Sequence, residues 1–235
     1  MLHSVGMFLS YERYPEALRR AAELAASAGP LRALVAGVES EESARAFIEA
    51  LTPARLASVD FVDWCETPLR RIRSAVEASD PRVNCVHTNV LTDDWVDRPY
   101  AMIVGDSFIK QFSFELKPRV IERLARGLGP GGVLVLREYF GELDGLLDQF
   151  WSTLQRCLRA CGWAELAPQA AQQVLETRIP ELSAFMNQRG STYREESDFL
   201  AVLDTLDLVV LECDKPRDAA YSVFVIGRRA DWSRR

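Results

Sequence analysis

The sequence predicts a doubly wound α/β domain built around a mainly parallel sheet. Short apolar runs rich in Val and Ile alternate with segments in which apolar residues recur every three or four positions. Strands of this composition are typical of parallel sheets that carry helices on both faces. At the carboxyl end the alternation stops, and two strand-like runs follow each other with only a short turn-rich link between them.

The alternating part contains five expected strands, at residues 31–36, 58–63, 83–88, 100–105 and 132–138. Three apolar stripes between them indicate helices: Ala44, Phe47, Ile48 and Leu51, then Leu69, Ile72 and Val76, then Val120, Ile121, Leu124 and Leu128. Two helix-start signals agree with the stripes, because Ser40 precedes two glutamates and Pro118 opens the third helix.

The two runs at the carboxyl end, residues 206–213 and 221–227, are expected to pair as an antiparallel hairpin. A parallel return would need a crossover of about a dozen residues or more, and the link is shorter than that. Ahead of the hairpin, residues 163–195 look helical but contain no strand, so this insertion is either an extra packing layer or a lid. We interpret residues 1–30 as an amino-terminal helical segment and the whole chain, 1–235, as one domain.

Composition narrows the classes of function. With 235 residues, of which 48% are hydrophobic, the chain is long enough to bury one substantial core. Its formal net charge of -6 disfavours nucleic acid and anionic lipid as partners. No run approaches the roughly 20 apolar residues that a membrane span needs, and the amino end lacks the features of a signal peptide. We therefore expect a cytoplasmic protein without a membrane partner.

The five cysteines do not form a metal-binding pattern. Their odd number and scattered positions suit reduced thiols. Cys157 and Cys161 lie four residues apart on an expected helix, but the only histidines are His3 and His87, and no second ligand pair stands at zinc spacing. We expect no metal site, and we interpret His87, inside an expected strand, as a core residue with a structural partner.

Two stretches carry a resemblance to a known family. Residues 100–108 read Tyr-Ala-Met-Ile-Val-Gly-Asp-Ser-Phe, and residues 124–138 contain Leu128-Gly129-Pro130-Gly131-Gly132 ahead of an apolar strand. With the alternating strands and the terminal hairpin, they resemble the class I S-adenosylmethionine-dependent methyltransferases. The resemblance implies a Rossmann-like fold of three layers, whose seven-stranded sheet has the order 3-2-1-4-5-7-6 and an antiparallel last strand. In the quoted turn, Pro130 fixes one dihedral and the glycines after it tolerate positive φ.

The resemblance also nominates binding residues, because ligands of open parallel sheets bind beyond the carboxyl ends of the strands. Asp63 looks like the acid that ends the second strand and accepts hydrogen bonds from both ribose hydroxyls. The other expected cofactor-binding residues follow the strand ends: Trp64, Asn89 and Val90 near the adenosine, and Asp106, Ser107 and Phe108 beside the methionine part. Asn89 stands where the family usually has an acid, and its amide can accept and donate.

The loop after the first strand departs from the family pattern. Of the usual three glycines only Gly37 remains, Val35 replaces the usual acid, and Glu39 takes the second glycine position. The stretch Gly37-Val38-Glu39-Ser40-Glu41 is similar to a Gly-Val-Thr-Pro-Glu loop in some bacterial methyltransferase-like proteins. We therefore expect Gly37, Val38 and Glu39 to contact the cofactor.

These residues predict an enzyme that moves a methyl group from S-adenosylmethionine to O, N or C of a small organic molecule. Positioning supplies most of the acceleration, and a base is needed only when the acceptor loses a proton. The candidate catalytic residues are Asp106, Tyr11 and Glu138. The alternative is an inactive methyltransferase-like scaffold, which the altered first loop favours, and a homodimer is open in either case. A nicotinamide oxidoreductase is disfavoured because the dinucleotide fingerprint is missing.

Overall fold

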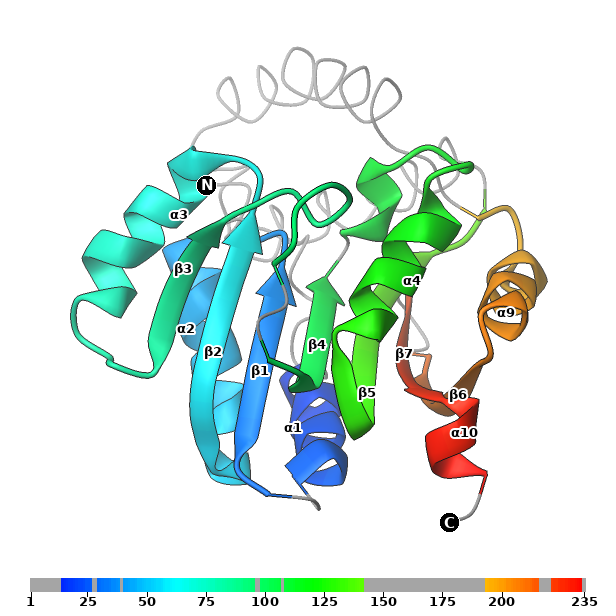
Figure 1. Ribbon diagram of the computed structural model, residues 1–235, viewed down its shortest axis with the longest axis horizontal. Helices are drawn as coiled ribbons and strands as arrows, with labels where there is room; N and C mark the ends of the chain where they lie inside the picture. The colour runs from blue at the N-terminus through cyan, green and yellow to red at the C-terminus, as the bar shows by residue number, and fades with distance from the viewer. Residues whose placement is uncertain are drawn as a thin grey trace, which may run out of the picture.

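The computed structural model describes residues 14–26, 29–38, 40–95, 98–106, 108–141, 193–215 and 221–233. Seven strands form one sheet in the order β3-β2-β1-β4-β5-β7-β6 (Figure 1). The strands are β1 (Leu31–Ala36), β2 (Leu56–Asp63), β3 (Val83–His87), β4 (Tyr100–Asp106), β5 (Leu128–Tyr139), β6 (Leu208–Asp214) and β7 (Tyr221–Arg228). Strands β1 to β5 run parallel, whereas β7 is antiparallel to both β5 and β6. The predicted fold class and strand order are confirmed.

Helices cover both faces of the sheet and make it the middle of three layers (Figure 1). The helices and turns are α1 (Tyr14–Ala26), α2 (Glu41–Leu51), η2 (Thr52–Ala54), α3 (Glu66–Ile72), η3 (Arg73–Glu77), η4 (Ile109–Gln111), α4 (Lys117–Arg126), α9 (Glu196–Thr205) and α10 (Arg229–Trp232). Helices α1, α2 and α3 contribute to one hydrophobic cluster and α4 and α9 to the other. At the start of α2, Ser40 caps the helix as predicted by accepting from the amide of Ser43 at 3.2 Å.

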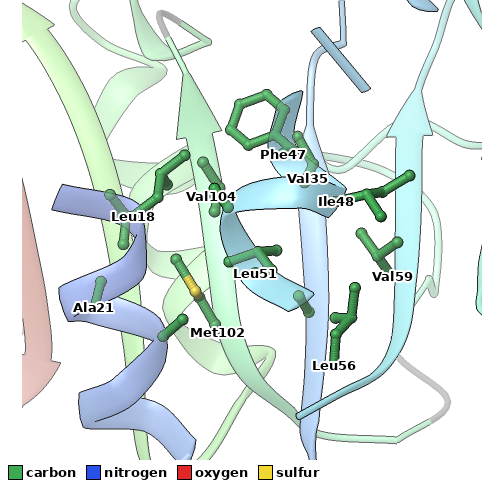
Figure 2. Close-up of a cluster of buried hydrophobic side chains, with 14 of the residues drawn as sticks. Leu18, Ala21, Val35, Phe47, Ile48, Leu51, Leu56, Val59, Met102 and Val104 are labelled. Carbon is green, nitrogen blue, oxygen red and sulfur yellow. The ribbon is translucent and has the colours of Figure 1, made fainter. Parts of the chain in front are cut away.

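Alternate residues of each central strand enter the two cores. In β1, Val35 faces the α1 and α2 side, and Leu34 faces the α4 side, each fully buried. Figure 2 shows Leu18 of α1 and Leu51 of α2 packed over Val35, Met102 and neighbouring strand residues. This double coverage explains why the strands read as near-continuous apolar runs rather than as alternating patterns.

Strand β5 begins earlier than the sequence predicts, inside the glycine-rich turn. Strand β5 begins at Leu128, immediately after the α4 cap, and its register against β4 shifts before Val133. Gly131 has a φ of +68°, as expected for a turn glycine. At Gly132 a side chain is disfavoured for another reason, since a Cβ there would crowd the carbonyl oxygen of Tyr100 at 3.0 Å.

The connection from β3 to β4 contains no helix in its described part, residues 88–95 and 98–99. Nearby, the α4 face of the sheet carries a polar cluster beside its apolar core. The carboxylate of Asp60, only 6% exposed, accepts from Arg32 at 2.8 Å and from the Tyr100 hydroxyl at 2.7 Å. Arg32 also lies 4.1 Å from the centre of the Tyr100 ring. A buried carboxylate needs such partners, so the cluster belongs to the fold.

Within the described ranges, no helix has the length and apolar character that a bilayer crossing requires. The cytoplasmic location stays a prediction. Residues 163–192, expected to form either an extra packing layer or a lid, lie outside the described residues, as do Tyr11, Glu39 and Ser107.

Candidate active site

The predicted site residues that the structure describes all lie at the carboxyl edge of the sheet. They are Gly37 and Val38 after β1, Asp63 and Trp64 at the end of β2, Asn89 and Val90 after β3, Asp106 and Phe108 at the end of β4, and Glu138 near the end of β5. Backbone bonds join these strand ends, because the amide of Gly37 donates to Val62 and that of Thr88 to Asp63, both at 3.0 Å. Strand order reverses between β1 and β4, which is where open parallel sheets bind ligands.

Asp63 presents a half-buried carboxylate at this edge. Its Oδ1 accepts from the amide of Cys65 at 2.7 Å. Burial raises the pKa of Asp63, while the amides of Cys65 and Trp64 and the charge of His87 lower it. A carboxylate has about four acceptor positions, so this side chain keeps the capacity to bind hydroxyl groups of a ligand.

His87 supports the same turn from the neighbouring strand. Its Nε2 lies 2.8 Å from the carbonyl oxygen of Trp64, whose own side chain is 64% exposed. The structural partner expected for His87 is confirmed, whereas its placement in the core is wrong, because the side chain is exposed. It ends an edge strand, beyond the part of β3 that the helices cover.

The loop after β3 is fixed by its own hydrogen bonds. The side-chain oxygen Oδ1 of Asn89 accepts from the backbone N–H of Leu91 at 3.0 Å. The backbone N–H of Asn89 donates to the carboxylate of Asp93 at 2.7 Å. The carbonyl of Val90 accepts from Trp95 at 3.1 Å and from Arg123 at 3.0 Å, and the Val90 side chain is buried. Asparagine commonly stabilises turns in this way, so Asn89 has a structural role here beside the predicted contact with adenine.

The ring of Phe108 covers Gly37 at the point where strand order reverses. Gly37 has a φ of +75°, and a Cβ at this position would collide with Cδ2 of the ring and lie 3.2 Å from Cε2. Phe108 is 6% exposed, and its ring meets Phe112 edge to face at 5.1 Å. Phe108 was predicted to lie beside the methionine part of the cofactor, whereas its ring is part of the core on the α4 side.

Val38 likewise turns its side chain inward. It is 2% exposed and belongs to the core beneath α1 and α2. Only its backbone therefore remains to contact a cofactor.

Asp106 forms a buried ion pair with Arg137 of the adjacent strand. The Nε of Arg137 lies 2.5 Å from Oδ1 of Asp106, and the two side chains are 7% and 12% exposed. The guanidinium also lies over the rings of Tyr14 and Tyr221, at 5.1 and 5.3 Å. The predicted catalytic residue Asp106 is thus held by a cation on the α1 face of the sheet.

Glu138 points to the opposite face, since successive strand residues alternate. It is 1% exposed, and burial raises its pKa to about 7, although Lys117 and Lys110 oppose the shift and Asp106 adds to it. Lys117, the first residue of α4, is fully buried, and burial lowers its pKa while the charge of Glu138 raises it. The pair brings a carboxylate and an ammonium group together beside the predicted site.

Three charged residues of this region were not predicted from the sequence: Lys110, Lys117 and Arg137. Arg137 was detectable, because a cation directly after an apolar strand core is unusual. Lys117 gave no signal, since a lysine before the helix-opening Pro118 is normally solvated.

The structure gives no indication of a metal centre in the part of the chain that it describes. No group of three or more His, Cys, Asp or Glu residues there is placed to hold an ion.

Comparisons with known proteins bear on the fold. No family model matches the sequence, and no curated protein matches it. Among solved structures, magnesium protoporphyrin IX methyltransferase from Synechocystis, with bound SAH, matches with a TM-score of 0.60 at 14% identity, over 94% of this chain and 84% of that one. Mitomycin 7-O-methyltransferase MmcR matches with a TM-score of 0.56 at 15% identity, over 90% of this chain and 54% of the other.

A third match is a Rhodobacter sphaeroides protein named as a zinc-dependent alcohol dehydrogenase, with a TM-score of 0.60 at 16% identity, over 89% of this chain and 90% of that one. This chain spans only about half the length of several matched methyltransferases. In MmcR, for example, the match covers 54% of the chain. The chain therefore has the fold of the class I S-adenosylmethionine-dependent methyltransferases. At these identities the likeness establishes the fold, and function depends on the site.

Proposed function

We propose that this protein transfers a methyl group from S-adenosylmethionine to a small organic molecule by direct in-line displacement. The observation that carries the proposal is the half-buried carboxylate of Asp63, which ends β2 beside the point of strand reversal. Its turn is fixed by the bonds of Cys65 and His87, so the carboxylate is oriented before any ligand arrives. A preorganised acceptor of two hydrogen bonds suits the vicinal hydroxyls of a ribose.

The remaining cofactor contacts follow from position along the edge. Beyond Asp63, the exposed indole of Trp64 supplies a stacking face for the adenine. Asn89 and Val90 lie on the next strand end, and Gly37, Val38, Glu39, Asp106, Ser107 and Phe108 are assigned to the methionine part. The residues at the ends of β2 and β3 fit the nucleoside half of the cofactor. The methionine half can reach the backbone of Gly37 only if the Phe108 ring leaves its place over this glycine.

The cofactor would supply a methyl group that is already activated, so the chain has to position, exclude water and in some reactions take a proton. Of the predicted catalytic residues, Asp106 is engaged by Arg137. Glu138 retains one oxygen, Oε1, that is buried without a hydrogen-bond partner among the described residues. We therefore assign the proton-accepting role to Glu138 and a positioning role to Asp106, while Tyr11 remains a candidate from sequence.

The solved structures of similar fold are consistent with a small acceptor. Their names include an O-methyltransferase in complex with SAM and 2-hydroxy-5-methyl naphthoic acid, and another in complex with apigenin. A formal net charge of -6 also disfavours a nucleic acid acceptor. We also retain two proposals made from the sequence, a cytoplasmic location and a homodimer.

A second candidate function, an inactive scaffold of the same fold, is favoured by one contact. The Phe108 ring explains why position 37 is glycine, because no other residue leaves room for it. In the scaffold reading Gly37 therefore serves packing alone and no ligand approaches its backbone.

Calorimetric titration with S-adenosylhomocysteine separates the two functions. We expect saturable binding and a rise in melting temperature, because a ligand that binds only the folded state stabilises it by mass action. The exposed Glu122 on α4 provides a matched control, and Glu122→Gln should bind as the unmodified chain does. Absence of both heat and thermal shift in the unmodified chain would support the scaffold.

A further inference from the structure

Two buried oxygen atoms near the end of β5 have no hydrogen-bond partner among the described residues. They are Oε1 of Glu138 and the hydroxyl of Tyr193, in side chains that are 1% and 2% exposed. Buried polar atoms in folded proteins are almost always paired, so each unpaired atom needs an explanation. A ligand group that hydrogen-bonds to both atoms would supply such an explanation.

The two side chains lie in the same cluster. The backbone joins them, because Tyr193 bridges to Phe140, two residues after Glu138, and its carbonyl accepts from Gly141 at 3.0 Å. The charge of Glu138 acts on the phenol, since burial and this charge both raise the pKa of Tyr193. The ammonium of Lys117 lies 4.4 Å from the centre of the Tyr193 ring and interacts with the Glu138 carboxylate.

Aromatic side chains connect this cluster to the surface. Phe114 meets Tyr193 edge to face at 5.7 Å and is 48% exposed, one of three large apolar side chains that the described residues expose. The ammonium of Lys117 lies 5.3 Å from its ring. A flat apolar molecule in contact with Phe114 would therefore have buried polar groups beside it.

We propose that Glu138 and Tyr193 bind the hydroxyl group of the methyl acceptor, and that the acceptor is a small aromatic alcohol. This inference rests on the proposed methyltransferase function. A hydroxyl group donates one hydrogen bond to Oε1 of Glu138 and accepts another from the Tyr193 hydroxyl. A carboxylate has no proton to donate and an ammonium group has no lone pair to accept with, so neither satisfies both atoms.

The arrangement also accounts for the proton. As the hydroxyl oxygen bonds to the methyl carbon, the carbon–sulfur bond breaks with its electron pair on sulfur, and the O–H proton passes to Glu138. The products are a methyl ether, a neutral thioether and a protonated Glu138, which returns the proton to solvent. Lys117 stabilises negative charge on the oxygen during the transfer because its ammonium lies in the same cluster.

The test is a fluorescence titration of the full chain with 2-naphthol and with 2-methoxynaphthalene, which lacks the hydroxyl proton. We expect 2-naphthol to bind at least about tenfold more tightly, because only its hydroxyl group can donate to Glu138. Glu138→Gln replaces a charged acceptor by a neutral one and should reduce that preference, whereas Tyr193→Phe removes a donor that both probe oxygens can accept from and should weaken the binding of both probes. Excited 2-naphthol transfers its proton to a nearby carboxylate, so naphtholate emission of the bound probe should disappear in Glu138→Gln. The adjacent Tyr139→Phe is the control and should keep both the preference and the emission.

Equal binding of the two probes to the unmodified chain, or unchanged binding of both probes in Tyr193→Phe, would overturn the inference. The phenylalanine variant keeps the ring and its contacts, so it remains informative even if Glu138→Gln unfolds. The titration needs no cofactor and is therefore independent of the methyltransferase proposal. Hydroxyl-dependent binding without any S-adenosylhomocysteine binding would keep the hydroxyl site and reject methyl transfer, whereas the reverse result would reject the site alone.

Discussion

The ring of Phe108 lies in the space that Gly37 leaves by having no side chain, and it joins the end of β4 to the end of β1. This contact lies at the reversal of strand order, where a ligand of the fold would approach the backbone. It also combines a positive φ with a close side-chain contact at one glycine. Two predictions follow from this pair of residues.

Gly37→Ala should lower the free energy of unfolding by about 2–4 kcal/mol, the sum of left-handed backbone strain and overpacking. Gly141→Ala is the matched control, because Gly141 has a φ of +99° but nothing within 4 Å of its Cβ position. Urea unfolding should show the smaller, strain-only loss in the control. Equal losses in the two variants would mean that Phe108 does not restrict position 37.

Phe108→Ala should tighten the binding of S-adenosylhomocysteine by about tenfold, because a ligand that must displace the ring binds only the fraction of molecules in which it has moved. Calorimetry on the variant and the unmodified chain measures the change. Phe112→Ala is the control, since the centre of the Phe112 ring lies 5.1 Å from that of Phe108, while the three atoms nearest the Cβ position of Gly37 all belong to Phe108. Weaker binding in Phe108→Ala would show that the ring is itself a binding surface, as its sequence position suggested.

Asp63→Ala should weaken the binding of S-adenosylhomocysteine by about 1.5–3 kcal/mol, the range for hydrogen bonds to a charged group. Asp63→Asn separates the ligand from the turn, because its amide oxygen can still accept from the backbone of Cys65. We expect the asparagine variant to keep the stability of the fold and to lose affinity. Unchanged affinity in both variants would remove Asp63 from the site.

Arg137→Met should lower the free energy of unfolding by about 3–5 kcal/mol, because it leaves the carboxylate of Asp106 buried without its cation. The matched control is Asp204→Asn, which breaks an ion pair with Arg229 of the same 2.5 Å length whose side chains are 75% and 48% exposed. That pair should contribute less than about 1 kcal/mol. Denaturant titrations of both variants test whether burial decides the difference.

The buried Glu138 predicts a pH dependence of stability. The pKa of Glu138 is about 7 in the folded protein, against an ordinary value of 4.5. Between pH 4.5 and pH 7, Glu138 is therefore protonated in the folded state and ionised in the unfolded state. The protein should therefore lose stability as pH rises from about 4.5 to 7. Glu138→Gln removes the titrating group, and its stability relative to the unmodified chain should increase over the same window.

Thermal unfolding at pH 5 and pH 8 measures this difference. The comparison with Glu138→Gln isolates one residue, because Asp63 also has a raised pKa and titrates in both proteins. Glu122→Gln, at an exposed position on α4, should leave the pH dependence unchanged. A parallel pH profile in Glu138→Gln and the unmodified chain would show that Glu138 is ionised throughout.

Local sequence patterns were sufficient for the sheet. Each strand of the parallel part is a short apolar run, and the short hairpin link left one orientation for β7. The order of the strands, in contrast, was predicted only from the resemblance to a known family. Strand ends were less well predicted: β5 begins at Leu128 rather than at residue 132, because a register shift absorbs the glycine-rich turn. Helix α9 was missed, although the reciprocal bonds of Glu195 and Asp198 at its start form a capping box.

The site was predictable only where position along a strand determines it. Asp63 could be placed because it ends an apolar run, and the opposite directions of Arg137 and Glu138 follow from strand alternation. The position of Lys117 beside Glu138 could not be predicted, because Lys117 belongs to a helix whose packing against the strand leaves no mark in the sequence. Tyr193 was a sequence candidate for the site, but its pairing with Glu138 was not predicted. Likewise, nothing in the sequence near Gly37 indicates that the ring of Phe108 would cover it.

Strand β7 lies between β5 and β6 although it follows every other described strand in the chain. During synthesis the apolar residues 133–136 of β5 consequently stand at an open sheet edge until the last strand has emerged and inserted. Open edges of this kind pair readily with other chains, so newly made molecules are most prone to aggregate in that interval. Completion of the sheet therefore waits for β7, and deletion of this strand would leave the apolar edge of β5 exposed.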